Sequence, residues 1–323
     1  MFQTRITEMF GIQYPIVQGA MHRLSHAELA AAVSNAGGLG TVVTANLPSI
    51  AALRDELRKA KSLTDKPFCV NVSLFPGESP WNMDEIIEAV VAEGVKVIAT
   101  SGRNPEPYIK LLKSSGARII HKVPSARHAQ TVEKLGYDAV SVVGFECGGH
   151  PGLDDVTSLV LVPRTVDSVK IPVIAGGGFG DGRGLVAALA LGAEGVLMGT
   201  RFMATTECVL HSNVKQFMLQ AKETDTAVVA RSVRGNIRAL KTDYVLKLLE
   251  MEARGATAEE VRAMIDSRRG SKVSLEGDLN AGVWPCGQVV GMVDRILPVK
   301  EVIDSIISQA QGIMKRLGTQ MTH

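Results

Sequence analysis

Apolar and polar positions alternate in a regular order over the first 200 residues of the chain. Short apolar runs rich in β-branched residues predict buried strands, and the longer amphipathic stretches between them predict helices. Helices are expected, for example, at 27–36, 50–60, 126–135 and 184–191. The expected strands are 14–17, 39–43, 68–72, 95–100, 117–120, 139–143, 172–175 and 195–198.

Eight such strand and helix units predict an α/β fold of the TIM (β/α)8 barrel type. A doubly wound sheet would show the same alternation of strands and helices. The count of eight and the absence of a GxGxxG motif after the first strand favour the barrel.

After Arg201 the pattern changes to helices without strands, which we expect at 211–222, 244–253 and 258–267. A closing amphipathic helix is expected at 299–317. The chain is therefore predicted to have three parts. These are a barrel over 1–205, a helical insertion or cap near the C-terminus over 206–280, and a segment over 281–323 that packs back on the barrel.

Composition narrows the class of partner. The 323 residues carry 35 basic and 33 acidic side chains, so the net charge of +2 gives no field that points to nucleic acid or a membrane. No apolar run approaches the roughly 18 residues that span a bilayer, and no signal peptide is evident. The four cysteines form no CxxC pair and no metal-ligand spacing. We expect a reduced, cytoplasmic protein without a metal site that acts on a small molecule.

Two glycine-rich loops follow the last two expected strands. Strand 172–175 continues into Gly176, Gly177 and Gly178, and strand 195–198 continues into Gly199 and Thr200. In TIM barrels the loops after strands seven and eight often hold phosphate, because glycine lets backbone N–H groups approach an anion. These loops predict a phosphate site.

Polar residues also follow other strands. Asn71 and Ser73 share one side of the third strand, and Lys122 follows the fifth. Taken alone, Lys122 could equally be a surface lysine and Asn71 a turn residue. His150 lies in the loop GFECGGHPG after the sixth strand. The arginines at 231, 234 and 238 indicate a solvated face, or else a contact for an anionic ligand or a partner subunit.

Several longer segments carry a family resemblance that covers nearly the whole chain. They resemble the signatures of the nitronate monooxygenase family, formerly called 2-nitropropane dioxygenases. Two positions, Ala20 and Cys286, depart conservatively from residues that are common in that family. The segments are 15–21 (PIVQGAM), 36–40 (AGGLG), 148–152 (GGHPG), 175–179 (AGGGF), 198–202 (MGTRF) and 286–288 (CGQ).

The resemblance implies an FMN-dependent oxidoreductase with a non-covalent cofactor. Lys122 would lie near the pyrimidine end of the flavin, where its charge favours the reduced, anionic ring. By match to the motifs, the phosphate would be held by Gly176, Gly177, Gly178, Gly199 and Thr200. The residues that line the flavin would be Ala20, Met21, His22, Asn71, Ser73, Gly148 and Gly149.

The resemblance also implies the chemistry of His150. Family members pass electrons from a nitronate to the flavin and then to dioxygen, which yields a carbonyl compound and nitrite. Histidine suits this task because its neutral ring can accept the proton alpha to a nitro group. We therefore expect His150 to be catalytic.

Other functions remain open on the same residues. One branch of the family consists of NADH:quinone reductases, in which the loop 75–81 would receive the nicotinamide ring. Flavin-dependent enoyl-acyl-carrier-protein reductases are similar too. A flavin-free barrel in which Lys122 forms a Schiff base and a non-catalytic flavin-binding protein are further alternatives. A homodimer is one assembly that the resemblance allows.

Overall fold

The computed structural model describes residues 2–45, 47–75, 81–266 and 268–320. Eight parallel strands lie in the order β1-β8-β7-β6-β5-β4-β3-β2. Hydrogen bonds from Gln18 N to Leu39 O and from Leu39 N to Ile16 O, both 2.9 Å, join β1 to the start of β2 and close the barrel. The strands are β1 (Ile16–Gln18), β2 (Gly40–Val43), β3 (Phe68–Ser73), β4 (Val97–Ser101), β5 (Arg118–Val123), β6 (Ala139–Val143), β7 (Val173–Gly176) and β8 (Gly195–Met198).

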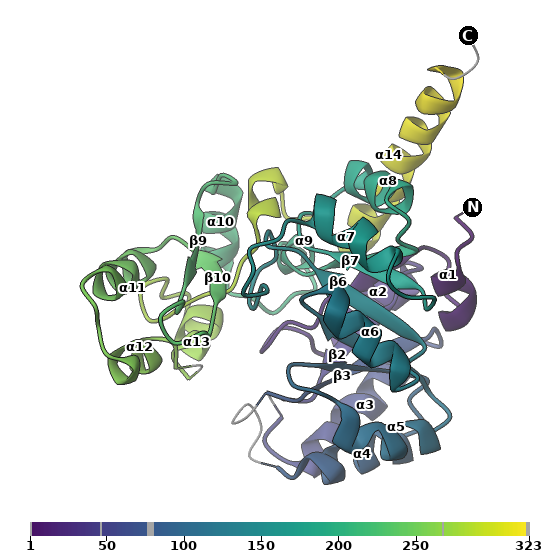
Figure 1. Cartoon of the computed structure of the whole chain (residues 1–323), viewed down its shortest axis with the longest axis horizontal. Helices are drawn as coiled ribbons and strands as arrows, with labels where there is room; N and C mark the ends of the chain where they lie inside the picture. Colours follow the sequence, from purple (N-terminus) through teal and green to yellow (C-terminus); the bar gives the residue numbers. More distant parts are fainter. Residues whose placement is uncertain (1, 46, 76–80, 267, 321–323) are drawn as a thin grey trace.

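Helices surround this barrel (Figure 1). The long helix α14 (Val299–Gln320) packs against α8 and α2 and completes the ring, while its far end projects away from the body. The prediction of a TIM barrel is confirmed, and the doubly wound alternative is wrong. The surrounding helices are α2 (Ala27–Asn35), α3 (Ile50–Leu63), α4 (Met83–Ala92), η1 (Glu106–Tyr108), α5 (Ile109–Ser114), α6 (Ala126–Lys134), α7 (Ser158–Val166) and α8 (Gly182–Ala190).

Helix α6 shows how local sequence sets these elements. The side chain of Ser125 accepts a hydrogen bond from the N–H of His128 and begins the helix. Ala129 and Val132, three residues apart, bury one face of the helix against the barrel. Gly136 follows with φ of +81°, a left-handed conformation that ends the helix and that glycine adopts without strain.

The amino-terminal end of the barrel is plugged by α1 (Arg5–Phe10). Ile6 and Phe10 are buried in an apolar cluster with barrel residues such as Ile120 and Ile174. The Thr4 hydroxyl donates to the carbonyl of Glu194, next to the start of β8. With this end closed, the carboxyl ends of the strands are left to carry a site.

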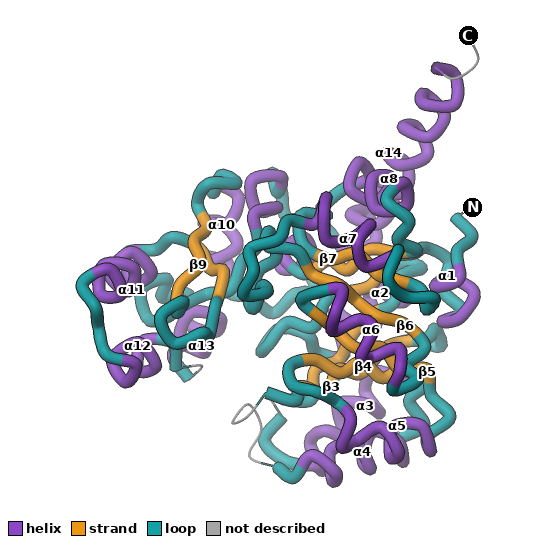
Figure 2. Tube along the Cα trace, viewed as in Figure 1, coloured by secondary structure: helices purple, strands orange, loops and turns teal. Residues whose placement is uncertain are grey.

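A cap follows the short helix α9 (Thr200–Met203) and lies at one side of the barrel mouth. It contains two antiparallel strands (Figure 2), so the prediction of helices without strands is wrong. All four residues of β10 are buried, because the strand packs on α11 and also on barrel loops. The cap elements are α10 (Ser212–Gln220), β9 (Thr226–Val229), β10 (Ile237–Leu240), α11 (Asp243–Ala253), α12 (Ala258–Met264), α13 (Arg269–Ser271) and the π-helical turn η2 (Lys272–Glu276).

The chain returns from the cap to the barrel through residues 281–287 and the turn η3 (Gln288–Met292). Pro285 pairs with Ala239 of the cap hairpin. Two residues later, Gly287 N donates a 2.9 Å hydrogen bond to Thr200 Oγ1 at the end of β8. This return segment therefore ties the cap to the barrel mouth.

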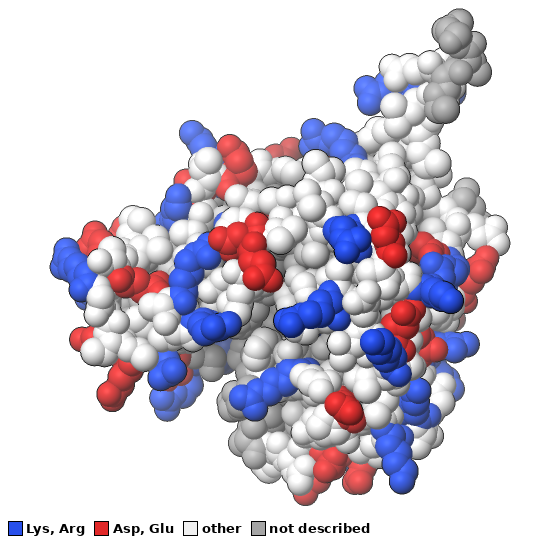
Figure 3. Space-filling model, viewed as in Figure 1, with Lys and Arg blue, Asp and Glu red and all other residues white. Residues whose placement is uncertain are grey.

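Charged side chains of both signs are interspersed over the face drawn in Figure 3. This distribution agrees with the near-neutral composition and shows no large single-sign patch on that face. Within the described residues, no helix is long and apolar enough to cross a membrane.

Candidate active site

A cavity of about 890 Å³ lies between the carboxyl ends of the barrel strands and the cap. Its volume is in the upper part of the range of ligand pockets, roughly 300–1,000 Å³. Every predicted site residue except Gly176 lines it. Gly176 is instead the last residue of β7, where its carbonyl accepts a 2.9 Å hydrogen bond from Gly144 N.

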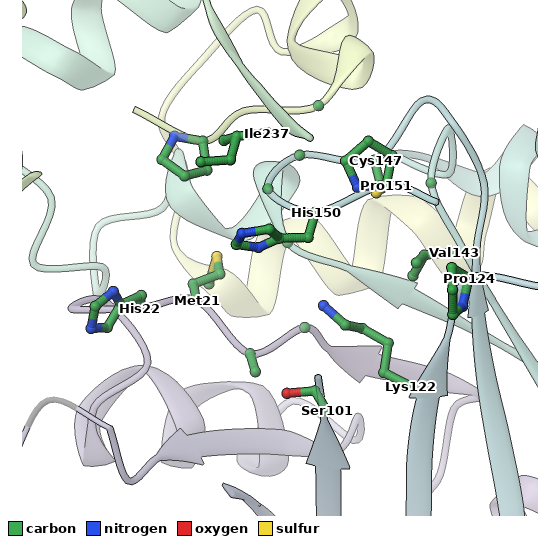
Figure 4. Close-up of a pocket in the computed structure, with 18 of the residues that line it drawn as sticks. Met21, His22, Ser101, Lys122, Pro124, Val143, Cys147, His150, Pro151 and Ile237 are labelled. Carbon is green, nitrogen blue, oxygen red and sulfur yellow. The ribbon is translucent and has the colours of Figure 1, made fainter. Parts of the chain in front are cut away.

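Polar side chains from three adjacent strands meet on one wall of this cavity. Asn71 lies inside β3 rather than in a turn, and its Nδ2 is 3.5 Å from the Oγ of Ser101 at the end of β4. Lys122 of β5 is half-buried, and its side chain extends into the cavity (Figure 4). Lys122 is therefore not a surface lysine.

The two glycine loops form a backbone cradle. Gly177 and Gly178 have φ of +86° and +82°, left-handed conformations that glycine adopts without strain, and both line the cavity without a side chain. A Cβ on Gly177 would lie 2.9 Å from the carbonyl oxygen of Gly144, so a larger residue does not fit. At Gly199 a Cβ would not collide with the backbone. It would lie inside the cavity, in ordinary contact with the Cγ of Met21 at 3.7 Å.

Ser158, the first residue of α7, connects the loop after β6 to the loop after β7. Its N–H donates to both carboxylate oxygens of Glu146 at 3.0 Å. Its Oγ donates to the carbonyl of Gly177 at 2.6 Å. The loop that carries His150 and the glycine cradle are therefore held in one framework.

His150 reaches the cavity from the end of that loop. Its ring packs on Phe75 with 4.8 Å between ring centroids, and its side chain points to the same space as that of Lys122 (Figure 4). Surrounding protein atoms desolvate the ring and, with the charges of Lys122 and His22, lower the pKa of His150 to about 4. The ring is nevertheless exposed to the open cavity, where solvent offsets part of this effect. At neutral pH the imidazole is neutral.

His22 lies on another part of the cavity wall and is turned away from His150 (Figure 4). Burial, followed by the charge of Arg23, lowers the pKa of His22 to about 4. Both imidazoles are therefore neutral at pH 7, but only His150 shares its space with Lys122.

Several cavity residues were not predicted as site residues. Ser101 follows the rule that polar residues mark strand ends, and that rule would have found it. Ile237 of the cap and Trp284 of the return segment reach the cavity only because the cap docks beside the barrel mouth, which no local sequence pattern predicts. Arg23 lies in the loop after β1, next to the predicted residues Met21 and His22, so the strand-end rule would have found it as well. The predicted nicotinamide loop at 75–81 lies mostly outside the described residues, and of its described residues Phe75 lines the cavity.

The arginine-rich stretch divides into two kinds of environment. Arg231 and Arg234 are exposed, as expected for a solvated face. Arg238 is only 3% exposed, so the expectation is wrong for this residue. Its position in β10 places it under the loop that carries His150, where Phe145 lies against its guanidinium.

Comparisons with known proteins agree with this site at the level of the family. The nitronate monooxygenase family model matches residues 3–309. The chain is 31% identical to a probable nitronate monooxygenase of Staphylococcus saprophyticus, covering 97% of this chain and 99% of the relative. The family is one of flavoproteins.

Two other relatives are at least as similar. One is (3aS,4S,5R,7aS)-5-hydroxy-7a-methyl-1-oxo-octahydro-1H-indene-4-carboxyl-CoA dehydrogenase of Rhodococcus jostii, at 35% identity over 98% of both chains. The other is the solved structure of FabK from Thermotoga maritima, at 38% identity and a TM-score of 0.93 over 99% of this chain and 100% of that one. The chain is thus an oxidoreductase enzyme, and it belongs to the nitronate monooxygenase family.

Proposed function

We propose that this enzyme binds FMN and oxidises alkyl nitronates to carbonyl compounds and nitrite. His150 would be the base that converts neutral nitroalkanes to nitronates. The observation that carries this proposal is the pairing of a neutral imidazole with an ammonium group over one cavity. His150 and Lys122 face that cavity beside a phosphate-type glycine cradle.

The cavity residues fit FMN in three respects. Gly177, Gly178, Gly199 and Thr200 would hold the phosphate through backbone N–H groups and one hydroxyl. The close packing at Gly148, where a Cβ would lie 2.7 Å from Gly287 N, leaves backbone rather than side chain facing the flavin. The ring would lie among side chains from the loop after β1 and from β3 and β5, namely Ala20, Met21, His22, Asn71, Ser73 and Lys122. FMN supplies the two-electron oxidation and the reaction with dioxygen.

The protein supplies proton transfer and charge. With its neutral ring, His150 accepts the proton from the carbon alpha to the nitro group, so that the substrate becomes a nitronate anion and the ring an imidazolium. The Lys122 ammonium stabilises the negative charge that develops in the cavity. Phe75 packs against the imidazole and limits its orientations.

Replacement of His150 by Asn tests this assignment. Turnover of neutral nitroalkane should fall by roughly 10²-fold or more, the usual contribution of a positioned general base. Preformed nitronate has already lost the proton and should be affected much less. His128→Asn, a change at a second histidine that lines the cavity, is the matched control and should alter neither substrate. Equal losses for nitroalkane and nitronate would refute the role of His150 as a base.

An acyl-CoA thioester is a second candidate substrate. The size of the cavity favours it, and so does the similarity to the Rhodococcus jostii dehydrogenase, whose name gives a carboxyl-CoA as its substrate. Arg127 and Arg234 also line the cavity, and neither forms an ion pair within the described part of the chain. A proton alpha to a thioester carbonyl is acidic for the same electronic reason as one alpha to a nitro group, so His150 would keep its task.

Anaerobic mixing separates these substrates from one another. Bleaching of the flavin by nitronate supports the first proposal, and bleaching by a saturated acyl-CoA alone supports the second. If NADH bleaches the flavin rapidly while nitronate and acyl-CoA do not, the NADH:quinone reductase alternative is favoured instead.

A further inference from the structure

Arg238 links the cap to the loop that carries His150. It lies on β10, is buried, and contacts that loop with both its backbone and its side chain. The backbone forms an antiparallel pair with Gly149, in which Arg238 N donates to Gly149 O at 2.7 Å and Gly149 N donates to Arg238 O at 3.1 Å. His150 is the next residue after Gly149.

The side chain holds the other end of the same loop. Its Nε donates a 3.0 Å hydrogen bond to the carbonyl of Phe145, and its guanidinium carbon lies 4.4 Å from the centre of the Phe145 ring. Its Nη1 donates to Thr226 Oγ1 on β9 at 3.1 Å, which fixes the guanidinium to the hairpin. Nη2 is buried and has no hydrogen-bond partner among the described residues.

We infer that Arg238 is a positioning residue, which sets the location of the His150 ring by fixing residues 145 and 149 to the cap hairpin. Only a planar group with several donors in fixed directions can stack on Phe145 and bond to its carbonyl and to Thr226 together, so lysine would not replace it. This inference rests on the proposed role of His150 as a base.

The chain offers a matched control in Arg231. Its guanidinium also lies over Phe145, at 5.7 Å, but the side chain is exposed and paired with Asp155. Arg231 therefore shares the aromatic contact and the charge of Arg238 without the buried hydrogen bonds to the loop.

The test compares Arg238→Met, Arg238→Lys and Arg231→Met on neutral nitroalkane and on preformed nitronate. A displacement of about 1 Å can reduce turnover by roughly 10²-fold. We therefore expect Arg238→Met to lower kcat for nitroalkane by at least about 10-fold, with the KM for nitronate little changed. Arg238→Lys should recover only a minor part, and Arg231→Met should behave as the wild type.

A second measurement does not depend on activity. Hydrogen exchange of the backbone N–H of Gly149, which the Arg238 carbonyl protects, should accelerate in Arg238→Met and stay unchanged in Arg231→Met. Suppose that His150→Asn lowers turnover of nitroalkane selectively. If Arg238→Met then leaves both nitroalkane turnover and the exchange of the Gly149 N–H unchanged, the inference about Arg238 is wrong. If His150→Asn shows no selectivity, the proposed function itself fails, and the exchange result alone then decides whether Arg238 holds the loop.

Discussion

The surroundings of His150 combine desolvation, a nearby positive charge and an aromatic neighbour. The protein around it disfavours the charged ring, the ammonium group of Lys122 adds positive potential, and Phe75 packs on one side of the imidazole. At neutral pH a histidine in this setting is in the neutral form that a general base requires, and it is a weaker base than a free imidazole. Its lowered pKa also means that the ring stays neutral at pH values at which a free histidine begins to bind a proton.

The first prediction concerns the pH dependence of nitroalkane oxidation. Since His150 must be neutral to act, kcat/KM should be retained as the pH falls to the ordinary histidine pKa of about 6.5 and should decline only at a lower pH. The variant His150→Asn should lack this acidic limb. A limb centred at or above 6.5 in the wild type would contradict the environment described for His150.

The second prediction tests the glycine cradle. Gly177 is a poor position for this purpose, because its Cβ would collide with Gly144 and disturb the fold. Gly199 has no positive φ, and its Cβ would lie in the cavity beside Met21. Gly199→Val should therefore give folded protein with little bound flavin, measured by visible absorbance and circular dichroism.

The control for that variant is Gly312→Val on α14, where a Cβ would meet nothing within 4 Å. It should retain the flavin content of the wild type. Stoichiometric flavin in Gly199→Val would show that the phosphate lies elsewhere.

The third prediction concerns Lys122. Methionine keeps most of the length of the side chain and removes its charge, so Lys122→Met should lower the reduction potential of the bound flavin. The exposed residue Lys110 offers a control, and Lys110→Met should leave the potential unchanged. An unchanged potential in Lys122→Met would place the ammonium away from the ring.

Residues at strand ends could be predicted from the sequence because all parallel strands of a barrel present their carboxyl ends to one face. Asn71, Lys122 and Gly199 needed only a correct assignment of strands. Ile237 and Trp284 depend on how the cap docks, and this geometry is set by contacts between residues far apart in the chain.

Among the elements, strands β4 and β5 are joined by a buried polar network. Thr100 Oγ1 lies 2.7 Å from His121 Nδ1 and 3.0 Å from the hydroxyl of Tyr137. Burial, followed by the positive charge of Lys122, lowers the pKa of His121 to about 4. His121 is therefore neutral in the folded barrel at pH values where the unfolded chain would bind a proton.

The fourth prediction follows from this difference in proton binding. The unfolded chain protonates His121 below about pH 6.5 and the folded chain only near pH 4, so the free energy of unfolding should fall as the pH is lowered between these values. The full loss is on the order of 3 kcal/mol. From pH 7 to pH 5, urea unfolding should show a smaller decrease in stability for His121→Gln than for the wild type. Identical pH dependence would show that His121 does not contribute.

The cap hairpin shows why one pair of elements was missed. A strand with one buried face alternates in hydrophobicity, but β10 is buried along its whole length and includes Arg238, while β9 has two half-buried residues in its centre. Neither segment therefore shows the alternation of apolar and polar residues that predicts a strand. Three helices of the cap, α10, α11 and α12, were predicted close to their observed bounds, whereas the short α13 and η2 were not predicted.

At the scale of the whole molecule, the barrel was predictable because its signal is repeated eight times and each unit has the same order. The repeated pattern still indicates a barrel when one of the strands is weakly predicted. The cap has no such repetition. It borders the cavity, supplies Ile237 to the wall, and through Arg238 contacts the loop of His150. Barrel and cap together form the site.

This arrangement also explains why relatives with different substrates share the fold. The barrel provides the cradle and the strand-end residues, whereas the cap and the mouth of the cavity determine what can approach them. Under the proposed role of His150 as a base, neutral nitroalkanes and acyl thioesters would both give up a proton to this residue, but they differ in the space that they need beyond it.

We propose that His150 accepts a proton from a nitro compound and that Lys122 stabilises the negative charge that develops beside a bound flavin. The most direct measurement is anaerobic mixing of the purified protein with propyl-2-nitronate, while the visible absorbance of oxidised flavin is followed in time. The account predicts rapid bleaching of that absorbance by nitronate, and bleaching by the neutral nitroalkane that His150→Asn abolishes. Protein that contains flavin yet is not bleached by either compound would contradict it.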